Sequence, residues 1–487
     1  MGNIPYNRDN AAMRLPPGRG RTAVEFTPQW SAHDLAEHDR QHVWHPLTQH
    51  TPYLAGQHPL IIARGQASTV FDTEGTPYLD AAAGLWCVNV GYDRQELIAA
   101  GIRQLQELAY YPLTQSHPAA IRLAARLAEY LVHTPHFFFS NSGSEANEVA
   151  FKAVRQYWRQ QGYADKTKII SRYRGYHGST LGALSATGQP ERKRGYGPLA
   201  GDFIQVSPPY CYRCPFGLSH PTCGLQCAAD FERRIQIEGP DTVAAVMVEP
   251  VIAGGGVLVA PPGYLAAVEA ICRRHQVLLI VDEVVTGFGR TGRMFGYEHD
   301  GVSPDVVTMA KGLASGYMPI GATAFSQRIF DGFLGDAESG RHFRHVNTFG
   351  GHPVATAVSL ANLEVLASEG LVERAARLGD YLLGELRSAL AGSEGVGDIR
   401  GLGLLVGVEL VDPSSGGPVS TATMRRVARQ LIQNGIVAGK TTDIERDDNN
   451  VVILAPPLVM TSEEGDRLVS TLAAGIRNIL TGAVPGY

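Results

Sequence analysis

Short apolar runs alternate with helix-like stretches through the middle of the chain. The apolar runs have the length of strands, and they cover residues 136–141, 168–171, 242–250, 277–284 and 305–312. Residues 144–162 carry apolar side chains at helical spacing, and residues 261–276 are helix-like, with Pro262 placed to open the helix. Continuous apolar strands separated by helices predict an α/β fold in which helices cover both faces of a parallel sheet.

After about residue 355 the pattern becomes mostly helical. Two helix-like segments, 353–370 and 371–390, precede a glycine-rich pair of strands at 399–410. A further helix and an apolar strand at 450–460 follow. This pattern predicts a second, α+β domain at the C-terminus, and no internal repeat is visible.

Composition indicates an ordinary globular protein. Hydrophobic residues make up 44% of the 487 residues and charged residues 18%, with a net charge of −5. No basic block favours nucleic acid as a partner. No apolar run reaches the ~18 residues that a membrane span needs, and residues 1–25 lack the apolar core of a signal peptide. We therefore expect a soluble, cytoplasmic protein with an N-terminal arm and no membrane partner.

Four of the six cysteines lie close together in the sequence, between residues 211 and 227. They are Cys211, Cys214, Cys223 and Cys227. Their CxxC…CxxxC spacing is compatible with a zinc ion or an iron–sulfur cluster. The simpler interpretation is a loop with reduced thiols in a reducing compartment. We expect no metal and keep the cluster as the less favoured alternative.

Chemistry is expected where strands of a parallel sheet end and loops begin. The first such place is "SNSGSEANE", residues 140–148. Ser142 and Glu145 have the spacing of a capping box that opens a helix, and Gly143 lets the backbone approach a ligand closely. Free N–H groups at this helix start would favour an anion such as phosphate. The alternative is a capped helix without a ligand.

Two charged residues follow other apolar strands. Asp282 ends "VLLIVD", and a carboxylate there either caps the next turn or holds a cationic ring nitrogen. Lys311 follows "DVVTMA", where loss of solvation lowers the pKa of its amine. A neutral amine attacks carbonyl groups and forms a Schiff base. The alternative is a lysine whose ammonium group reaches water.

Taken together, these features meet the requirements for holding pyridoxal 5′-phosphate (PLP). The cofactor needs a phosphate site, an acid for its pyridine nitrogen and a lysine for its aldehyde. Tyr176, in "YRGYHGST", offers an aromatic face on which the cofactor ring can stack. On its own, Tyr176 would be interpreted as a core or surface tyrosine.

The chain resembles the class III aminotransferases of PLP fold type I. Residues 281–322 are similar to the family signature nearly end to end, and "NSGSEANE", "YHGST", "VEPV", "HVNTFGGHP" and "APPLVM" occur in the family's order. The resemblance covers roughly residues 35–480. It implies a large domain with a central, mostly parallel seven-stranded sheet, and a smaller α+β domain built from both chain ends. The implied boundaries are 1–30 (arm), 31–80, 81–343 and 344–487.

The resemblance also implies roles for individual residues. Lys311 matches the lysine that bonds to the cofactor and then moves the proton. Asp282 matches the partner of the pyridinium nitrogen, and Val284 matches the residue packed on the ring face opposite Tyr176.

Further positions match the cofactor's surroundings. Gly143 and Ser144 match the phosphate cup, and Ser142 and His177 stand beside matched positions in the same motifs. Glu249 resembles a glutamate that takes part in switching between substrates. Thr348 resembles a residue that reaches the phosphate of the neighbouring subunit, which implies a homodimer with shared active sites.

The substrate pocket is implied less directly. Residues 44–50 and 83–92 are most similar to the ω-amino acid:pyruvate and taurine:pyruvate branch. Trp86 would line the pocket, with Trp44 and Tyr111 as neighbours or, alternatively, as core aromatics. Many ω-aminotransferases carry a mobile arginine before "APP"; here Arg446 stands at a suitable distance, although it could instead pair with Asp447 and Asp448 in solvent. Arg400 is a weaker candidate for the same task.

The implied function is amino-group transfer by ping-pong half-reactions. The donor would be an ω-amino acid, taurine or a primary amine, and the acceptor a 2-oxo acid, with pyruvate expected. One alternative is another class III reaction, by an aminomutase, racemase or decarboxylase. The other is a catalytically silent PLP-binding regulatory protein, against which the intact Lys311 and Asp282 argue.

Overall fold

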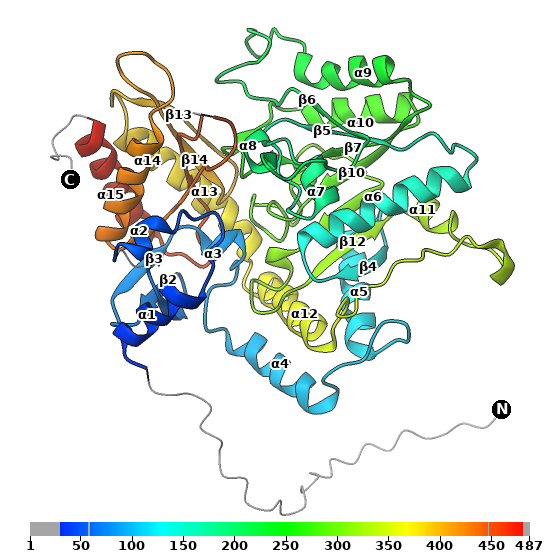
Figure 1. Cartoon of the computed structure of the whole chain (residues 1–487), viewed down its shortest axis with the longest axis horizontal. Coiled ribbons are helices and arrows are strands. Elements are labelled where there is room, and N and C mark those ends of the chain that lie inside the picture. The colour runs from blue at the N-terminus through cyan, green and yellow to red at the C-terminus, as the bar shows by residue number, and fades with distance from the viewer. Residues whose placement is uncertain (1–29, 57–58, 447, 481–487) are drawn as a thin grey trace, which may run out of the picture. The chain divides into compact units, whose positions relative to one another are not determined.

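The computed structural model describes residues 30–56, 59–446 and 448–480 (Figure 1). The predicted arm over residues 1–30 lies outside the described residues except for Trp30. Residues 1–63 with 72–76 form one compact unit, and residues 64–71 with 77–487 form the other. The first unit contains α1 (Ala32–His42) and α2 (Thr51–Leu54), and β1 (Ile62–Gln66) begins in it. The larger unit holds residues 64–71 and everything from residue 77 onward.

A seven-stranded sheet forms the centre of the larger unit. Its order is β4 (His136–Ser140), β12 (Gly321–Phe325), β11 (Val306–Met309), β10 (Leu278–Asp282), β7 (Val243–Val248), β5 (Lys168–Arg172) and β6 (Phe203–Val206). β12 runs antiparallel to both of its neighbours, and the other pairs are parallel. The prediction of a mostly parallel seven-stranded sheet is confirmed.

Both faces of this sheet are covered, which explains why its strands are continuously apolar. Leu278 and Ile280 of β10 pack in one cluster with α6 (Gly143–Gln160). The intervening Leu279 and Val281 belong to the main core, together with α9 (Gln226–Glu238) and α10 (Tyr264–Arg274). Figure 1 shows strands of the sheet between α6 and α10. Alternate side chains of one strand thus reach two hydrophobic layers.

The start of α10 differs from the prediction. The helix begins at Tyr264, and its N-cap is Gly263, with a left-handed φ of 79°. Pro262 therefore lies before the N-cap rather than in the first turn, so the prediction that it opens the helix was wrong by two positions.

The C-terminal third follows the predicted pattern. Its elements are α12 (Pro353–Ser368), α13 (Leu371–Ala389), β13 (Val396–Gly401), β14 (Val406–Leu410), α14 (Thr421–Gln433), β15 (Ile436–Val437), β16 (Gly439–Lys440), β17 (Val451–Leu454) and α15 (Ser462–Leu480). A four-stranded antiparallel sheet has the order β13-β14-β17-β16. β15 pairs in parallel with β3 (Pro77–Asp80), which brings segments from both chain ends together.

Other helices and short elements connect these layers. They are β2 (Thr69–Asp72), α3 (Ala83–Trp86), α4 (Gln95–Glu107), α5 (Pro118–Tyr130), α7 (Leu181–Ala186), α8 (Pro190–Lys193), β8 (Val251–Ile252), β9 (Leu258–Val259), α11 (Gln327–Asp331) and the 3₁₀ turns η1 (Gly296–His299), η2 (Lys311–Leu313) and η3 (Ala337–Ser339). α12 packs on α4 and α5. The boundaries expected at 80/81 and 343/344 stay a prediction, because residues 77–487 belong to one compact unit.

Within the described ranges, no single helix is long and apolar enough to cross a membrane. One pair, α12 and α13, passes the same test together by length and composition, and it is bent by 61°.

Because β10 is packed on both faces, truncation of the Ile280 side chain should strongly destabilise the fold. Its side chain is fully buried, so Ile280→Ala should lower the free energy of unfolding by about 2–5 kcal/mol through lost burial and a cavity. Ile237 of α9 is 61% exposed, and Ile237→Ala should change it by no more than about 0.5 kcal/mol. Urea unfolding of both variants measures the difference, and equal effects would contradict the packing described for β10.

Candidate active site

A cavity of about 470 Å³ opens beside the carboxyl ends of β10 and β11. Its size is typical of a small-molecule site. Nine residues that the sequence singled out lie around it: Ser142, Gly143, Ser144, Tyr176, His177, Glu249, Asp282, Val284 and Lys311. The parallel pairing of β10 with β11 aligns Asp282 with Thr308, so Asp282 and Lys311 leave the sheet at the same edge. The topology therefore gathers residues from five separate segments.

Lys311 lies two residues beyond the end of β11, at the start of η2. Its φ is 43°, a left-handed conformation that side-chain-bearing residues rarely adopt and that recurs at functional sites. Burial lowers the pKa of its amine, and the negative charges available at Cys87, Asp282 and Glu249 act against that shift. The Nζ atom lies 5.0 Å from the centre of the Trp86 ring. The structure thus supports the expectation of a lysine with a lowered pKa.

Asp282 is almost fully buried, and its carboxylate is fixed from three directions. Oδ2 accepts hydrogen bonds from His177 Nδ1 at 2.8 Å and from Asn147 Nδ2 at 3.0 Å. Oδ1 accepts the backbone N–H of Val284 at 3.0 Å. The carboxylate therefore does cap the next turn, as one interpretation held, and it also faces the cavity. The turn cap is confirmed, and the role of Asp282 toward a cationic ring nitrogen stays a prediction.

Asn147 is a site residue that sequence reasoning missed. It is buried in α6 and also donates to the carbonyl of His177 at 2.6 Å. Its Oδ1 atom has no protein partner. The available signal was its position four residues after Gly143, because residues at that spacing share one helix face.

Glu249 adds a second buried carboxyl group to the cavity. Its Oε1 atom accepts the backbone N–H of Tyr176 at 3.1 Å, which ties the Tyr176 loop to the end of β7. Burial, followed by the nearby charge of Asp282, raises the pKa of Glu249 to about 7, although His177 and Arg172 oppose the shift. The cavity therefore contains an acid that takes up or releases a proton near neutral pH.

The start of α6 has the geometry of an anion site. Ser142 caps the helix by accepting the N–H of Glu145 at 3.2 Å. The predicted capping box is only half formed, because the Glu145 carboxylate accepts the N–H of Asn141 instead, at 2.7 Å. The amides of Gly143 and Ser144 belong to the first turn, where N–H groups lack partners within the helix. They line the cavity and are suited to a phosphate group.

Two close approaches shape this anion site. A Cβ atom at position 143 would lie 2.9 Å from both methyl groups of Val284, so only glycine fits there. Gly178 has a φ of 134°, and a Cβ atom there would lie 2.4 Å from Ser144 Oγ. Ser144 Oγ also accepts the N–H of Ser179 at 3.1 Å. An anion cup, a buried acid and a lysine with lowered pKa thus share one cavity, and this set fits PLP.

The expected substrate-pocket residues are placed less uniformly. Trp86 is half-buried beside Lys311. Tyr111 is 49% exposed and does not line the cavity. Trp44 belongs to the smaller unit and is 89% exposed. The alternative that Trp44 and Tyr111 are core aromatics is wrong for the described chain, and their role at a substrate pocket stays a prediction.

Two further candidates lie in exposed turns outside the cavity lining. Thr348 is exposed, and its carbonyl accepts the phenol of Tyr110 at 2.7 Å. Arg446 is exposed in the turn after Glu445. Of its two expected acidic partners, Asp447 lies outside the described residues, while Asp448 forms an ion pair with Arg174 at 2.5 Å.

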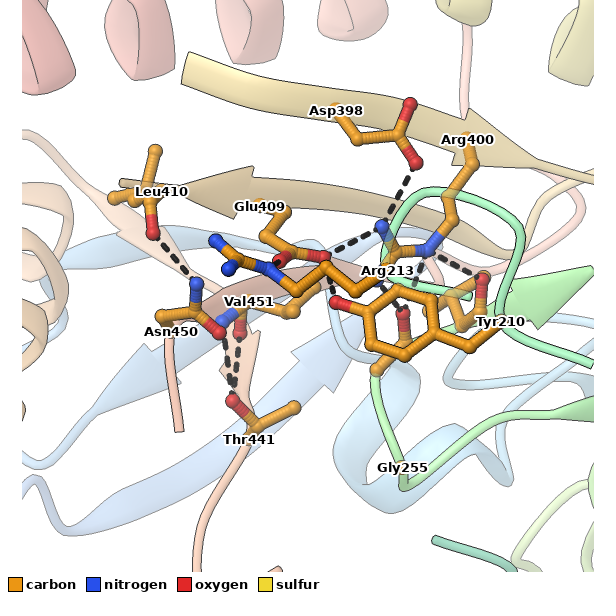
Figure 2. Close-up of polar contacts among 12 residues, drawn as sticks. Tyr210, Arg213, Gly255, Asp398, Arg400, Glu409, Leu410, Thr441, Asn450 and Val451 are labelled. Carbon is orange, nitrogen blue, oxygen red and sulfur yellow. Dashed lines mark hydrogen bonds and ion pairs between the residues drawn. The ribbon is translucent and has the colours of Figure 1, made fainter. Parts of the chain in front are cut away.

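Arg400 is committed to a buried network and is not positioned for a substrate. Its Nη1 atom donates to Glu409 at 2.7 Å and to Asp398 at 2.9 Å, while Nε and Nη2 donate to the carbonyl of Gly256. Figure 2 shows the Glu409 carboxylate among Arg400, Arg213 and Tyr210. This network joins the glycine-rich strand pair to the loop after β6.

The four clustered cysteines meet in space around a small cavity of about 20 Å³, together with His220. All are free thiols, and burial raises the pKa of Cys227 to about 11. In the part of the chain that the structure describes, no group of three or more His, Cys, Asp or Glu side chains is arranged to hold a metal ion. The metal alternative therefore gains no support.

Comparisons with known proteins place most of the chain among aminotransferases. Residues 53–476 match the family model described as "Aminotransferase class-III". The uncharacterized aminotransferase YhxA of Bacillus subtilis is 48% identical, over 91% of this chain and 97% of that protein. The taurine–pyruvate aminotransferase of Bilophila wadsworthia is 41% identical, over 90% and 95%. The solved (S)-enantioselective omega-transaminase of Thermomicrobium roseum has 40% identity and a TM-score of 0.88, over 93% and 100%.

The buried carboxyl of Glu249 generates a prediction about pH. Its pKa in the folded state, about 7, lies above the unfolded value near 4.5, so the unfolded state loses its proton first and stability falls as pH rises through that interval. From pH 5 to pH 8, the cofactor-free wild type should lose about 2–3 kcal/mol of unfolding free energy relative to Glu249→Gln, which cannot ionise. Urea unfolding at both pH values measures this, and a pH-independent difference would contradict the raised pKa.

Proposed function

The chain belongs to the class III aminotransferases, a PLP-dependent family, and from that premise we propose that it is an ω-aminotransferase which holds PLP on Lys311. It is a transaminase, and its donor is an ω-amino acid, taurine or a primary amine. Its acceptor is a 2-oxo acid, and we expect that acid to be pyruvate. A relative that is 41% identical carries the name taurine–pyruvate aminotransferase, which supports this choice.

One observation carries the proposal: a single cavity is lined by Lys311, by Asp282 and by the first-turn residues Gly143 and Ser144. Each group supplies what a different part of PLP requires. The first-turn amides suit the phosphate, and Asp282 suits the protonated ring nitrogen. Tyr176 and Val284 border the same cavity and are suited to flank the ring.

When bound, PLP supplies an aldehyde carbon that bonds to amines and a ring that delocalises an electron pair. The chain's own residues do the rest. Lys311 has a lowered pKa, so its Nζ atom can carry the proton that moves during transfer. His177 and Asn147 hold Oδ2 of Asp282, which keeps the acid oriented for the ring nitrogen.

A panel of amine donors tests the function as a whole. Each donor is paired with pyruvate or with 2-oxoglutarate, and the change in cofactor absorbance and the keto or aldehyde product are followed. The proposal expects transfer that depends on the added acceptor and is faster with pyruvate. Conversion of more than one equivalent of amine per cofactor without any acceptor would contradict it.

Removal of the Lys311 side chain is the most direct test of a single residue within the site. In Lys311→Ala, the absorption of the lysine-bound cofactor should disappear and turnover should fall by at least about 10³-fold, because both the covalent link and the proton carrier are lost. Lys168→Ala is the matched control, since Lys168 pairs with Glu238 at the start of β5, outside the cavity. Normal transamination by Lys311→Ala would refute the role of this lysine.

We expect the enzyme to be a homodimer in which Thr348 of each subunit reaches the phosphate site of the partner subunit. Its exposed position leaves it available to a second copy. Thr348→Asp would place a negative charge near the phosphate and should inactivate the enzyme.

Coexpression of the Thr348→Asp and Lys311→Ala chains tests that arrangement. Each variant alone should be inactive, but their heterodimer contains one intact site. A random mixture should recover about a quarter of wild-type activity. A mixture that stays inactive, while its subunits associate normally, would contradict a role for Thr348 across the interface.

A further inference from the structure

Arg192 is a cation beside the site with no acidic partner among the described residues. It belongs to the short helix α8 and is half-buried. Its Nε atom donates to Gln189 Oε1 at 2.6 Å, and Nη2 donates to the Thr442 carbonyl at 3.3 Å. Both partners are neutral. Its neighbours Arg174 and Arg194, by contrast, pair with Asp448 and Glu191.

Two contacts place Arg192 just outside the cavity lining, next to Tyr176. Its guanidinium carbon lies 5.2 Å from the centre of the Tyr176 ring, and Tyr176 lines the cavity. Its partner Gln189 is fully buried and shares Gly254 as a neighbour with Trp86: a Cβ atom at Gly254 would lie 3.7 Å from Gln189 Nε2 and 3.6 Å from Trp86 Cη2.

Trp86 in turn lies beside Lys311, with Nζ 5.0 Å from its ring centre. Gln189 and Trp86 therefore connect Arg192 to the surroundings of the reactive amine.

Arg192 also reaches the segment in which the sequence led us to expect a substrate-binding arginine. Thr442 lies four residues before Arg446, and the backbone N–H of Glu191 approaches the Ile444 carbonyl at 3.5 Å. Arg446 itself stands in an exposed turn, and Arg400 is bound in its own network. A guanidinium from α8 thus contacts the segment that precedes Arg446.

We propose that Arg192 receives the acid group at the far end of the amine donor, a sulfonate or a carboxylate. A planar guanidinium donates two parallel hydrogen bonds to such a group. Its partial burial strengthens the attraction, and the Tyr176 ring below it holds its orientation. The inference rests on the proposed function and narrows it: the preferred donors are acidic ω-amino acids rather than neutral amines.

The donor half-reaction tests this assignment without interference from the acceptor, whose own carboxylate would complicate turnover. The holoenzyme is mixed with taurine or β-alanine and, in parallel, with neutral counterparts of the same shape, 2-(methylsulfonyl)ethylamine and β-alaninamide. The rate of the cofactor's absorbance change gives an apparent second-order rate constant for each. Comparing the two pairs separates sulfonate from carboxylate as the preferred group.

Arg192→Gln should slow the reaction of the preferred acidic donor by about 30-fold or more, as expected for a lost charge-assisted hydrogen bond. The reaction of its neutral counterpart should change less than about threefold. Arg192→Lys should restore part of the preference, because the charge remains while the fork is lost. Arg194→Gln, on the same turn but paired with Glu191, should match the wild type with every donor.

Three results would overturn the assignment. In the first, Arg192→Gln slows acidic and neutral donors equally, with an altered cofactor spectrum, which means that Arg192 only supports Tyr176. In the second, the variant behaves as the wild type. In the third, the wild type accepts neutral amines and neither acid, which would refute this inference but leave the aminotransferase intact. A wild type whose cofactor is bound but reacts with none of the four donors and no other amine would instead refute the proposed function.

Discussion

The site depends on keeping a half-buried amine and two buried carboxyl groups together in one cavity. Lys311 loses solvation, Glu249 responds with a raised pKa, and Asp282 is held by hydrogen bonds from His177 and Asn147. Burial of each charged group costs hydration free energy. That cost is offset by the other groups, or by a bound ligand that carries the opposite charge. A cationic ring nitrogen and a carbonyl carbon are such complements, which is why the arrangement fits a pyridine aldehyde phosphate.

The fold brings these groups to one edge of the seven-stranded sheet. The apolar strands β10 and β11 are buried on both faces, so their register is strongly specified, and their parallel pairing sends Asp282 and Lys311 out at the same end. The start of α6 approaches that end closely because Gly143 lacks a side chain against Val284. The hydrophobic layers therefore set the position of the polar groups, although they take no part in the chemistry.

Much of the fold and of the site was predictable, because local sequence patterns indicate the strands and the residues that follow them. Continuous apolar runs identify the strands, and Asp282 and Lys311 stand out as charges directly after them. Contacts between distant segments were not predictable: Glu145 turns to Asn141 rather than completing its capping box, and Asn147 reaches Asp282 across 135 positions. Arg192 was missed for the same reason, since its partner Thr442 lies 250 residues away. The role proposed for Thr348 across a subunit interface was implied by the family resemblance alone, because hydrophobic patterns and spacing in one chain do not reveal such a contact.

The central claim is that the Lys311 amine bonds covalently to PLP, and chemical trapping tests it most directly. Borohydride reduction of the purified holoenzyme fixes such a bond, and peptide mass spectrometry then locates the added pyridoxyl phosphate. The account predicts one modified residue, Lys311, and no modification after the cofactor has first been converted by an amine donor. Modification of a different lysine, with Lys311 unmodified, would contradict it.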